Sequence, residues 1–132
     1  MSGGLARYTA NGVLDNTFGI AGIAAVNTPN LLSSLALQDG KIIAAGAQVT
    51  RTTNRKGVTT ITRTFALSRY LANGAIDTTF GSSGLVTTAF ASSTEATIFN
   101  IAIQSDNKIV AVGKTGISFF TPNFLAMARY NR

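Results

Sequence analysis

A stretch of fifteen residues occurs twice in the chain, and this repeat limits the folds that are open to it. Residues 5–19 (LARYTANGVLDNTFG) recur 62 positions later as residues 67–81 (LSRYLANGAIDTTFG). A third copy begins at residues 128–131, 60 positions after the second. Self-similarity at a long, fixed period is typical of proteins in which each repeat is one supersecondary unit. We therefore expect a repeat protein with a unit of about 60 residues.

A second element also repeats, and both elements have the pattern of β-hairpins. Residues 35–46 (LALQDGKIIAAG) correspond to residues 101–113 (IAIQSDNKIVAVG), which have one more residue at the turn. Asn-Gly in the first element is a strong signal for a two-residue hairpin loop. Such a loop pairs Tyr8 with Asp15 and Tyr70 with Asp77. No stretch shows a sustained apolar period of 3.6 residues, so we expect no helix.

The strand pattern predicts an all-β fold of propeller-type blades, each with four antiparallel strands. In the first full unit we expect strands at residues 33–38, 41–50, 61–72 and 75–79, with 84–90 either extending the last strand or crossing to the next unit. The second unit has expected strands at 97–104, 108–114 and 123–132. The prediction is a single repeat domain over residues 1–132. It comprises an orphan hairpin and crossover (1–26), a full blade (27–90) and a blade without its last strand (91–132).

The combined motif resembles the bacterial delta-sixty repeat. It reads L-A-R-Y-x-x-N-G-x-x-D-x-T-F-G, followed by A-L-Q-x-D-G-K-I-x-x-x-G, and covers nearly the whole chain as two copies and a partial third. The resemblance implies blades similar to those of NHL-type propellers. It also implies an exported or cell-surface protein, and no catalytic residue, cofactor or defined ligand. The chain departs from the family in being short and in lacking the proline often found in the second turn.

Composition narrows the chemistry further. The chain has no Cys and no His, and it has 5 Asp+Glu against 11 Lys+Arg, a formal net charge of +6. These absences exclude disulfides, thiolate zinc sites, thiol nucleophiles and Ser–His catalysis. We therefore expect neither an enzyme nor a metal or cofactor site. The positive charge favours anionic partners.

Charged residues recur in register with the repeat. The carboxylates have two interpretations. In the first, they are structural: they bind the backbone of their own turn or a cross-strand neighbour, and each Arg pairs with the Asp eight residues later. In the second, they form a ring of cation ligands, which would need several acids in one place. We favour the first interpretation. Glu95 alone lies outside the repeat, and we expect it to be solvated. The repeated positions are Arg7, Arg69 and Arg129, with Asp15, Asp77, Asp39 and Asp106.

The two long connections within the blades differ in character. Arg51, Arg55, Lys56 and Arg63 form a basic connection that would suit a phosphate, a sulfated glycan or an acidic polymer, or would simply be a solvated tip. Nucleic acid is a weaker expectation, because no aromatic residue is interleaved with these basic residues. The other connection carries three Phe residues, either a contact patch for a protein or sugar ring or packing between blades or subunits. They are Phe119, Phe120 and Phe124.

Two blades cannot close a propeller, which has typically about four to eight. We expect copies of the chain to complete each other, three giving a six-bladed ring and four an eight-bladed one. The alternatives are a head-to-tail filament formed by strand complementation and a fragment of a longer array. Further partners would be a glycan or a protein. The chain shows no signal peptide, and the uncharged stretch 16–38 is too broken by polar residues to span a membrane.

Overall fold

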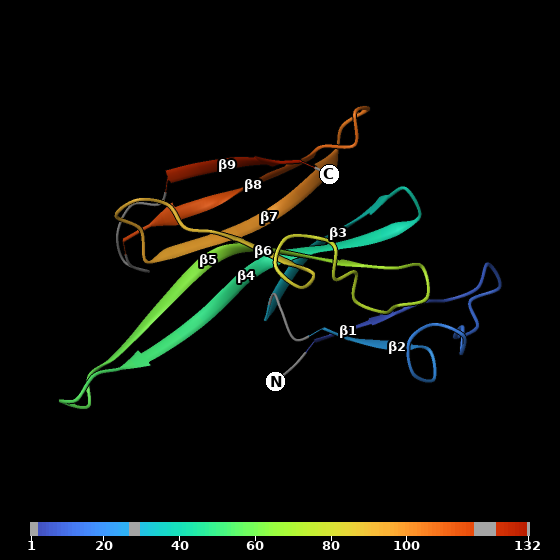
Figure 1. Ribbon diagram of the computed structural model, residues 1–132, viewed down its shortest axis with the longest axis horizontal. Coiled ribbons are helices and arrows are strands. Elements are labelled where there is room, and N and C mark those ends of the chain that lie inside the picture. The colour runs from blue at the N-terminus through green and yellow to red at the C-terminus, as the bar shows by residue number, and fades with distance from the viewer. Residues whose placement is uncertain (1–2, 27–29, 118–123, 132) are drawn as a thin grey trace.

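The computed structural model is all-β, which confirms the predicted fold class. It describes residues 3–26, 30–117 and 124–131, and these ranges contain no helix, hence none long and apolar enough to cross a membrane. Three antiparallel sheets are stacked in chain order, with the four-stranded one in the middle (Figure 1). The strands are β1 (Gly3–Ala6) with β2 (Ile23–Val26); β3 (Leu31–Gln38), β4 (Lys41–Thr53), β5 (Thr59–Tyr70) and β6 (Leu85–Thr88); and β7 (Glu95–Ile103), β8 (Ile109–Gly116) and β9 (Phe124–Tyr130).

The predicted strand at residues 75–79 is wrong. Only an isolated bridge between Tyr70 and Ile76 forms there. The Asp77 carboxylate accepts hydrogen bonds from both the amide and the hydroxyl of Thr79, and this turns the chain away from the sheet. The fourth strand of the middle sheet is instead β6, which lies within the stretch 84–90 and pairs with residues 65–68 of β5.

The predicted two-residue loop at Asn-Gly is also wrong, because the loop has three residues. Thr9 N donates to Val13 O and Gly12 N donates to Thr9 O, at 2.8 and 2.9 Å. Gly12 has a φ of 76°, the conformation that follows a type I turn in a three-residue hairpin loop. The extra residue shifts the pairing by one, so that Tyr8 lies opposite Leu14 and Asp15 N donates to Arg7 O.

Two apolar layers hold the three sheets together. Phe18 and Phe80, which share one position of the repeat, are buried in these layers at 1% and 4% exposure. Tyr70 is buried, whereas its counterpart Tyr8 is 62% exposed, because no further sheet among the described residues covers that face of the first sheet. The first layer contains Leu5, Phe18, Ala24, Val26, Ala44 and Tyr70, and the second contains Ile43, Ala45, Phe65, Leu67, Phe80, Ala96, Ile98, Ile101, Ile109, Ala111 and Ala126.

A glycine lies opposite an irregularity in the pairing of the first two strands of both larger sheets. Gly46 of β4 pairs with Leu32 where the β3 register shifts, and Gly113 of β8 pairs with Ile98 at the corresponding shift in β7. A Cβ atom on Gly46 would lie 1.7 Å from the Leu31 carbonyl oxygen. The glycine therefore lets the bulged strand approach its neighbour closely.

The β4–β5 hairpin projects far beyond the sheets and ends at the lower left of Figure 1. We call its outer part, residues 50–61, the arm; every residue in it is exposed. The strands remain paired along the arm up to Thr53 opposite Thr59. Since every residue of the arm is exposed, the arm contributes little to the core.

Candidate functional site

The charged repeat positions form a compact cluster beside the first Asp-x-Thr-Phe motif. Arg7 Nε donates to Asp15 Oδ2 at 2.8 Å, and the Thr17 amide and hydroxyl donate to Asp15 Oδ1 at 3.0 and 2.6 Å. The Arg7 guanidinium lies 4.9 Å from the centre of the Phe18 ring. The hydrogen bonds from Thr17, supported by Arg7, lower the pKa of Asp15. The predicted ion pair is thus present.

The second copy of this cluster has an additional cation. Arg69 Nε and Lys41 Nζ both lie 2.8 Å from Asp77 Oδ2, and the Arg69 guanidinium is 4.7 Å from the centre of the Phe80 ring. Asp77 is only 4% exposed. Hydrogen bonds from Lys41 first, and then from Thr79, hold the pKa of Asp77 far below its ordinary value of 3.8. Two strands, β4 and β5, therefore each supply one cation to this carboxylate.

The third copy is only half present. Arg129, on β9, is exposed, and its side chain has neither a hydrogen bond nor an ion pair among the described residues. Lys108, the counterpart of Lys41, binds Asp106 in its own turn and thereby lowers the pKa of that carboxyl. These two cations have no Asp-x-Thr-Phe segment beside them in the part of the chain that the structure describes.

The turns that precede β4 and β8 are bound to each other. Asn107 Nδ2 donates to both carboxylate oxygens of Asp39 at 3.1 and 2.9 Å, and Gln38 Nε2 donates to Asn107 O at 2.6 Å. Asp39 and Asp106 thus lie in turns, as their positions predict. Over residues 3–26, 30–117 and 124–131, no three acidic side chains come close enough together to hold a metal ion.

The prediction that Glu95 is solvated is wrong. Both of its carboxylate oxygens lie 2.7 Å from Arg63 Nη1, and the two side chains are only 12% and 16% exposed. The prediction that Arg63 belongs to the basic connection is wrong, because Arg63 lies in β5 beside the start of β7 and forms this ion pair. The pair therefore joins the middle sheet to the last one.

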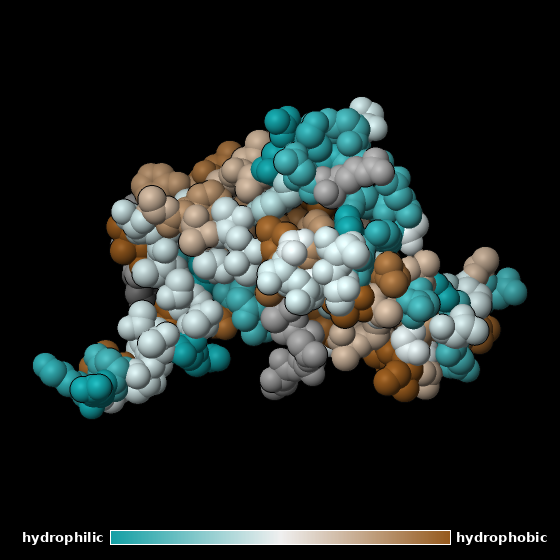
Figure 2. Space-filling model, viewed as in Figure 1, coloured by the Kyte–Doolittle hydropathy of each residue, from teal (hydrophilic) through white to brown (hydrophobic). Residues whose placement is uncertain are grey.

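The other three residues of the basic connection lie together on the arm. Arg51, Arg55 and Lys56 are exposed and form no ion pair within the described ranges. The sequence contains no acid between Asp39 and Asp77. Figure 2 shows the arm tip as a hydrophilic end at the lower left. Three positive charges, half of the formal net charge of +6, thus project into solvent on a narrow β-ribbon.

An apolar strip lies on the outer face of β9, where Leu125 and Met127 are 82% and 62% exposed. Phe124, at the start of this strand, is 64% exposed but alternates to the opposite face, the face of Ala126. Apolar side chains gather over β9 at the upper left of Figure 2. Phe119 and Phe120, predicted with Phe124 as a contact patch, lie outside the described residues. Large exposed apolar strips on soluble domains commonly mark interaction surfaces.

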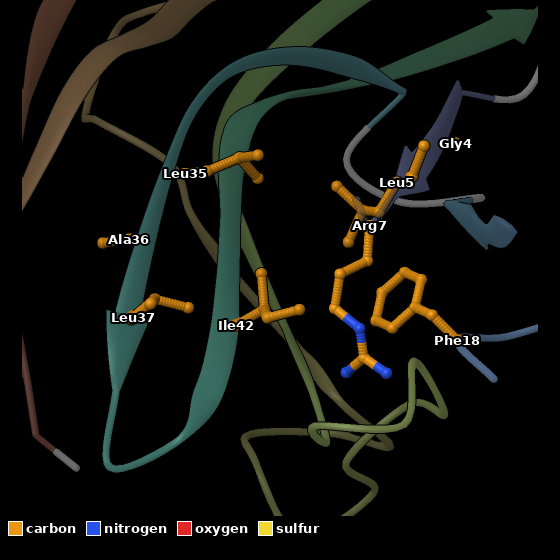
Figure 3. Close-up of a pocket in the computed structure, with 9 residues that line it drawn as sticks. Gly4, Leu5, Arg7, Phe18, Leu35, Ala36, Leu37 and Ile42 are labelled. Atoms are coloured by element: carbon orange, nitrogen blue, oxygen red, sulfur yellow. The ribbon is translucent and has the colours of Figure 1, made fainter. Parts of the chain in front are cut away.

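An apolar groove of about 540 Å³ separates the first sheet from the middle one. Figure 3 shows Leu5, Arg7 and Phe18 on one side of it, with Leu35, Leu37 and Ile42 on the other. Leu35 and Leu37 are 57% and 72% exposed. The groove lies where a complete first sheet would have two more strands, because β1 and β2 correspond to β5 and β6 of the middle sheet.

The sequence-based prediction did not identify the groove or the strip. The repeat contains a usable signal, because it aligns Met127 of β9 with Leu67 of β5 and with Leu5 of β1. Leu67 and Leu5 are buried by a neighbouring sheet, whereas Met127 is exposed. An exposed apolar residue whose repeat counterparts are buried therefore identifies a sheet face that lacks a neighbouring sheet.

The sequence matches one protein-family model, described as a domain of unknown function (DUF5122) beta-propeller. The match covers residues 2–18, 57–80 and 104–132, together more than half of the chain. No curated protein and no solved structure matches the chain.

Proposed function

The chain belongs to the DUF5122 β-propeller family, and on this basis we propose that it is a non-catalytic binding or scaffolding module that completes its propeller with further copies of itself. One complete sheet and two incomplete ones are too few for a closed propeller of about four to eight blades. The assignment of the repeat to the delta-sixty type, and export to the cell surface, are parts of the same proposal.

The observation that carries the proposal is that two apolar residues of the last sheet are exposed, although their counterparts in the middle sheet are buried in the core. Leu125 and Met127 are 82% and 62% exposed, whereas their repeat counterparts Phe65 and Leu67 are fully buried against the next sheet. Burying a large apolar side chain stabilises by about 1.5–3 kcal/mol. A neighbouring copy that covers this face would regain that free energy.

The proposed contact between copies joins the last sheet of one copy to the first sheet of another. Because these surfaces differ, the contact is heterologous and gives either a closed ring or an open filament. A closed ring of three copies has six blades, and one of four has eight. The second candidate is a structural filament, which is favoured by the edges of β1 and β9 that have no partner strand in the described part of the chain. Both arrangements cover the same apolar strip.

The molar mass in solution separates these candidates. We expect sedimentation velocity and light scattering to give a discrete trimer or tetramer across a range of protein concentrations. A continuous distribution of lengths would instead support the filament. A monomer at all concentrations would contradict self-assembly in either form.

We further propose that the arm binds an anionic glycan, because its three basic side chains are exposed. We expect the chain to be retained on a sulfated polysaccharide and a variant with Arg51, Arg55 and Lys56 replaced by Gln to elute at much lower salt. Each lost contact should reduce the slope of log affinity against log salt by about one. An R51K/R55K variant keeps the charge and should keep the retention. Equal retention of the Gln variant would exclude the arm as the binding surface.

A further inference from the structure

The structure contains two complementary halves of one charged cluster, and we infer that β9 of one copy replaces β1 of the next, where Lys108 and Arg129 bind Asp15. This inference rests on the proposed self-assembly and specifies the surfaces that meet. It commits to a second copy of the chain as the occupant of the groove beside β3.

The complete cluster in the middle sheet is the template. Asp77 is bound by Lys41 from β4 and by Arg69 from β5, each at 2.8 Å. Among the described residues, Asp15 has Arg7 from β1 but no counterpart of Lys41, because the first sheet has two strands there. Asp15 therefore binds one cation where its counterpart Asp77 binds two.

The last sheet supplies the missing half. Lys108 precedes β8 and Arg129 lies on β9, the counterparts of Lys41 on β4 and Arg69 on β5. In the described chain, Arg129 has no partner and Lys108 has only a local one. One copy thus presents the two cations, and another presents the Asp-x-Thr-Phe segment that binds them.

The backbone register of the exchange follows from the repeat. Leu5 pairs with Ala24 in the first sheet, and Leu67 pairs with Val86 at the same position of the middle sheet. Met127 is the counterpart of both leucines on β9. In the exchanged sheet, Met127 therefore lies opposite Ala24 of the next copy, and its side chain enters the layer that buries Leu5.

The same exchange fills the groove. The counterparts of Leu35 and Leu37 on β7 are Ile101 and Ile103, which pack in the second apolar layer, together with Ala36 and Ile43 of the preceding sheet. The last sheet carries Ala102 and Val110 at the corresponding positions, and neither is buried. Docked on the next copy, these two residues would cover Leu35 and Leu37 as Ala36 and Ile43 cover their counterparts.

Replacement, rather than addition, of β1 follows from strand order. Strands β1 and β9 are copies of the same repeat strand, and β8 already pairs on both edges with β7 and β9. Keeping both copies would make a five-stranded blade unlike the middle sheet. Strand β9 has 7 residues against 4 in β1, and its sheet brings two cations to Asp15 instead of one. The exchange therefore favours β9.

Single substitutions test the charged contact. We expect R129A to assemble at least about tenfold more weakly, the equivalent of about 1.4 kcal/mol. Its melting temperature as a monomer should be unchanged, because Arg129 has no partner in the described chain. The matched variant R7A removes the cation of the strand to be displaced, so it should assemble as well as the wild type or better. Equal assembly of R129A and wild type would overturn the inference.

A cysteine pair tests the strand exchange itself. The chain has no Cys, so M127C combined with A24C introduces the only two thiols. Under oxidising conditions we expect a ladder of disulfide-linked multimers, since cross-strand neighbours are within reach of a disulfide. M127C alone should give no ladder. If the wild type assembles but the double variant does not link, the exchange is wrong while the proposed function stands; if the wild type stays monomeric, the proposed self-assembly fails as well.

Discussion

Replacing Gly46 by alanine should destabilise the fold by about 3 kcal/mol or more, the upper range for forcing extra atoms into a packed core. The new Cβ would lie 1.7 Å from Leu31 O and 2.8 Å from the Leu31 carbonyl carbon. These are backbone atoms of the paired strand, so no side-chain rotation can relieve the contact. The β3–β4 pairing must open or shift, and this disturbs the layer that contains Ile43 and Ala45.

Urea denaturation at one fixed protein concentration measures this effect, because assembly makes stability depend on concentration. The control is G57A in the arm. Gly57 has a φ of 77° but open space around it, so alanine there should cost only about 1–2 kcal/mol from the left-handed backbone. A G46A variant as stable as G57A would show that the close approach at the bulge does not constrain the fold.

Replacing Asp77 by asparagine should destabilise the protein by about 3 kcal/mol, the lower end of the cost of breaking a buried ion pair. The Arg69 side chain is only 9% exposed and would lose its charged partner, and Lys41 would lose the same one. Both variants are compared as monomers, below the concentration at which the protein assembles, and D15N is the matched control. Asp15 binds one cation in the monomer and its side chain is 22% exposed, so D15N should lose less stability than D77N. Equal losses at both sites would contradict the structural difference between the two clusters.

The same pair of variants should differ in pH dependence. The pKa of Asp77 is depressed in the folded state, so its stabilising contribution is present above its ordinary value of 3.8 and is lost as the pH falls below that value. Denaturation of the wild type between about pH 5 and pH 2 should therefore show a decline that is weaker in D77N. A decline of the same size in D77N would assign the acid sensitivity to other carboxylates.

Regular spacing made the strands and the charged pairs predictable from the sequence. The repeat aligns Arg7 with Arg69 and Asp15 with Asp77, and a hairpin of either loop length brings each pair within reach. The loop length itself was not predictable, because Asn-Gly suits both a two-residue loop and the end of a three-residue one. The strand expected at 75–79 failed because the Asp77 side chain caps a turn there.

Contacts between distant segments could not be predicted in the same way. Glu95 looked unpaired because its partner Arg63 is 32 residues earlier, and only the packing of β7 against the middle sheet brings them together. The groove and the strip on β9 depend on which neighbouring strands are absent. The sequence shows that Leu35 and Met127 are apolar, but only the arrangement of the sheets shows that both are exposed.

The central claim, that one copy completes the cluster and the blade of the next, is tested most directly by mixing two defective copies. R129A keeps an intact Asp15, and D15N keeps intact Lys108 and Arg129, so each retains one working half of the interface. We predict that, at a protein concentration just sufficient for the wild type to assemble, each variant alone stays largely monomeric, and that an equimolar mixture forms a 1:1 dimer in sedimentation velocity. A mixture that behaves as the sum of two monomers, or variants that assemble alone as the wild type does, would contradict it.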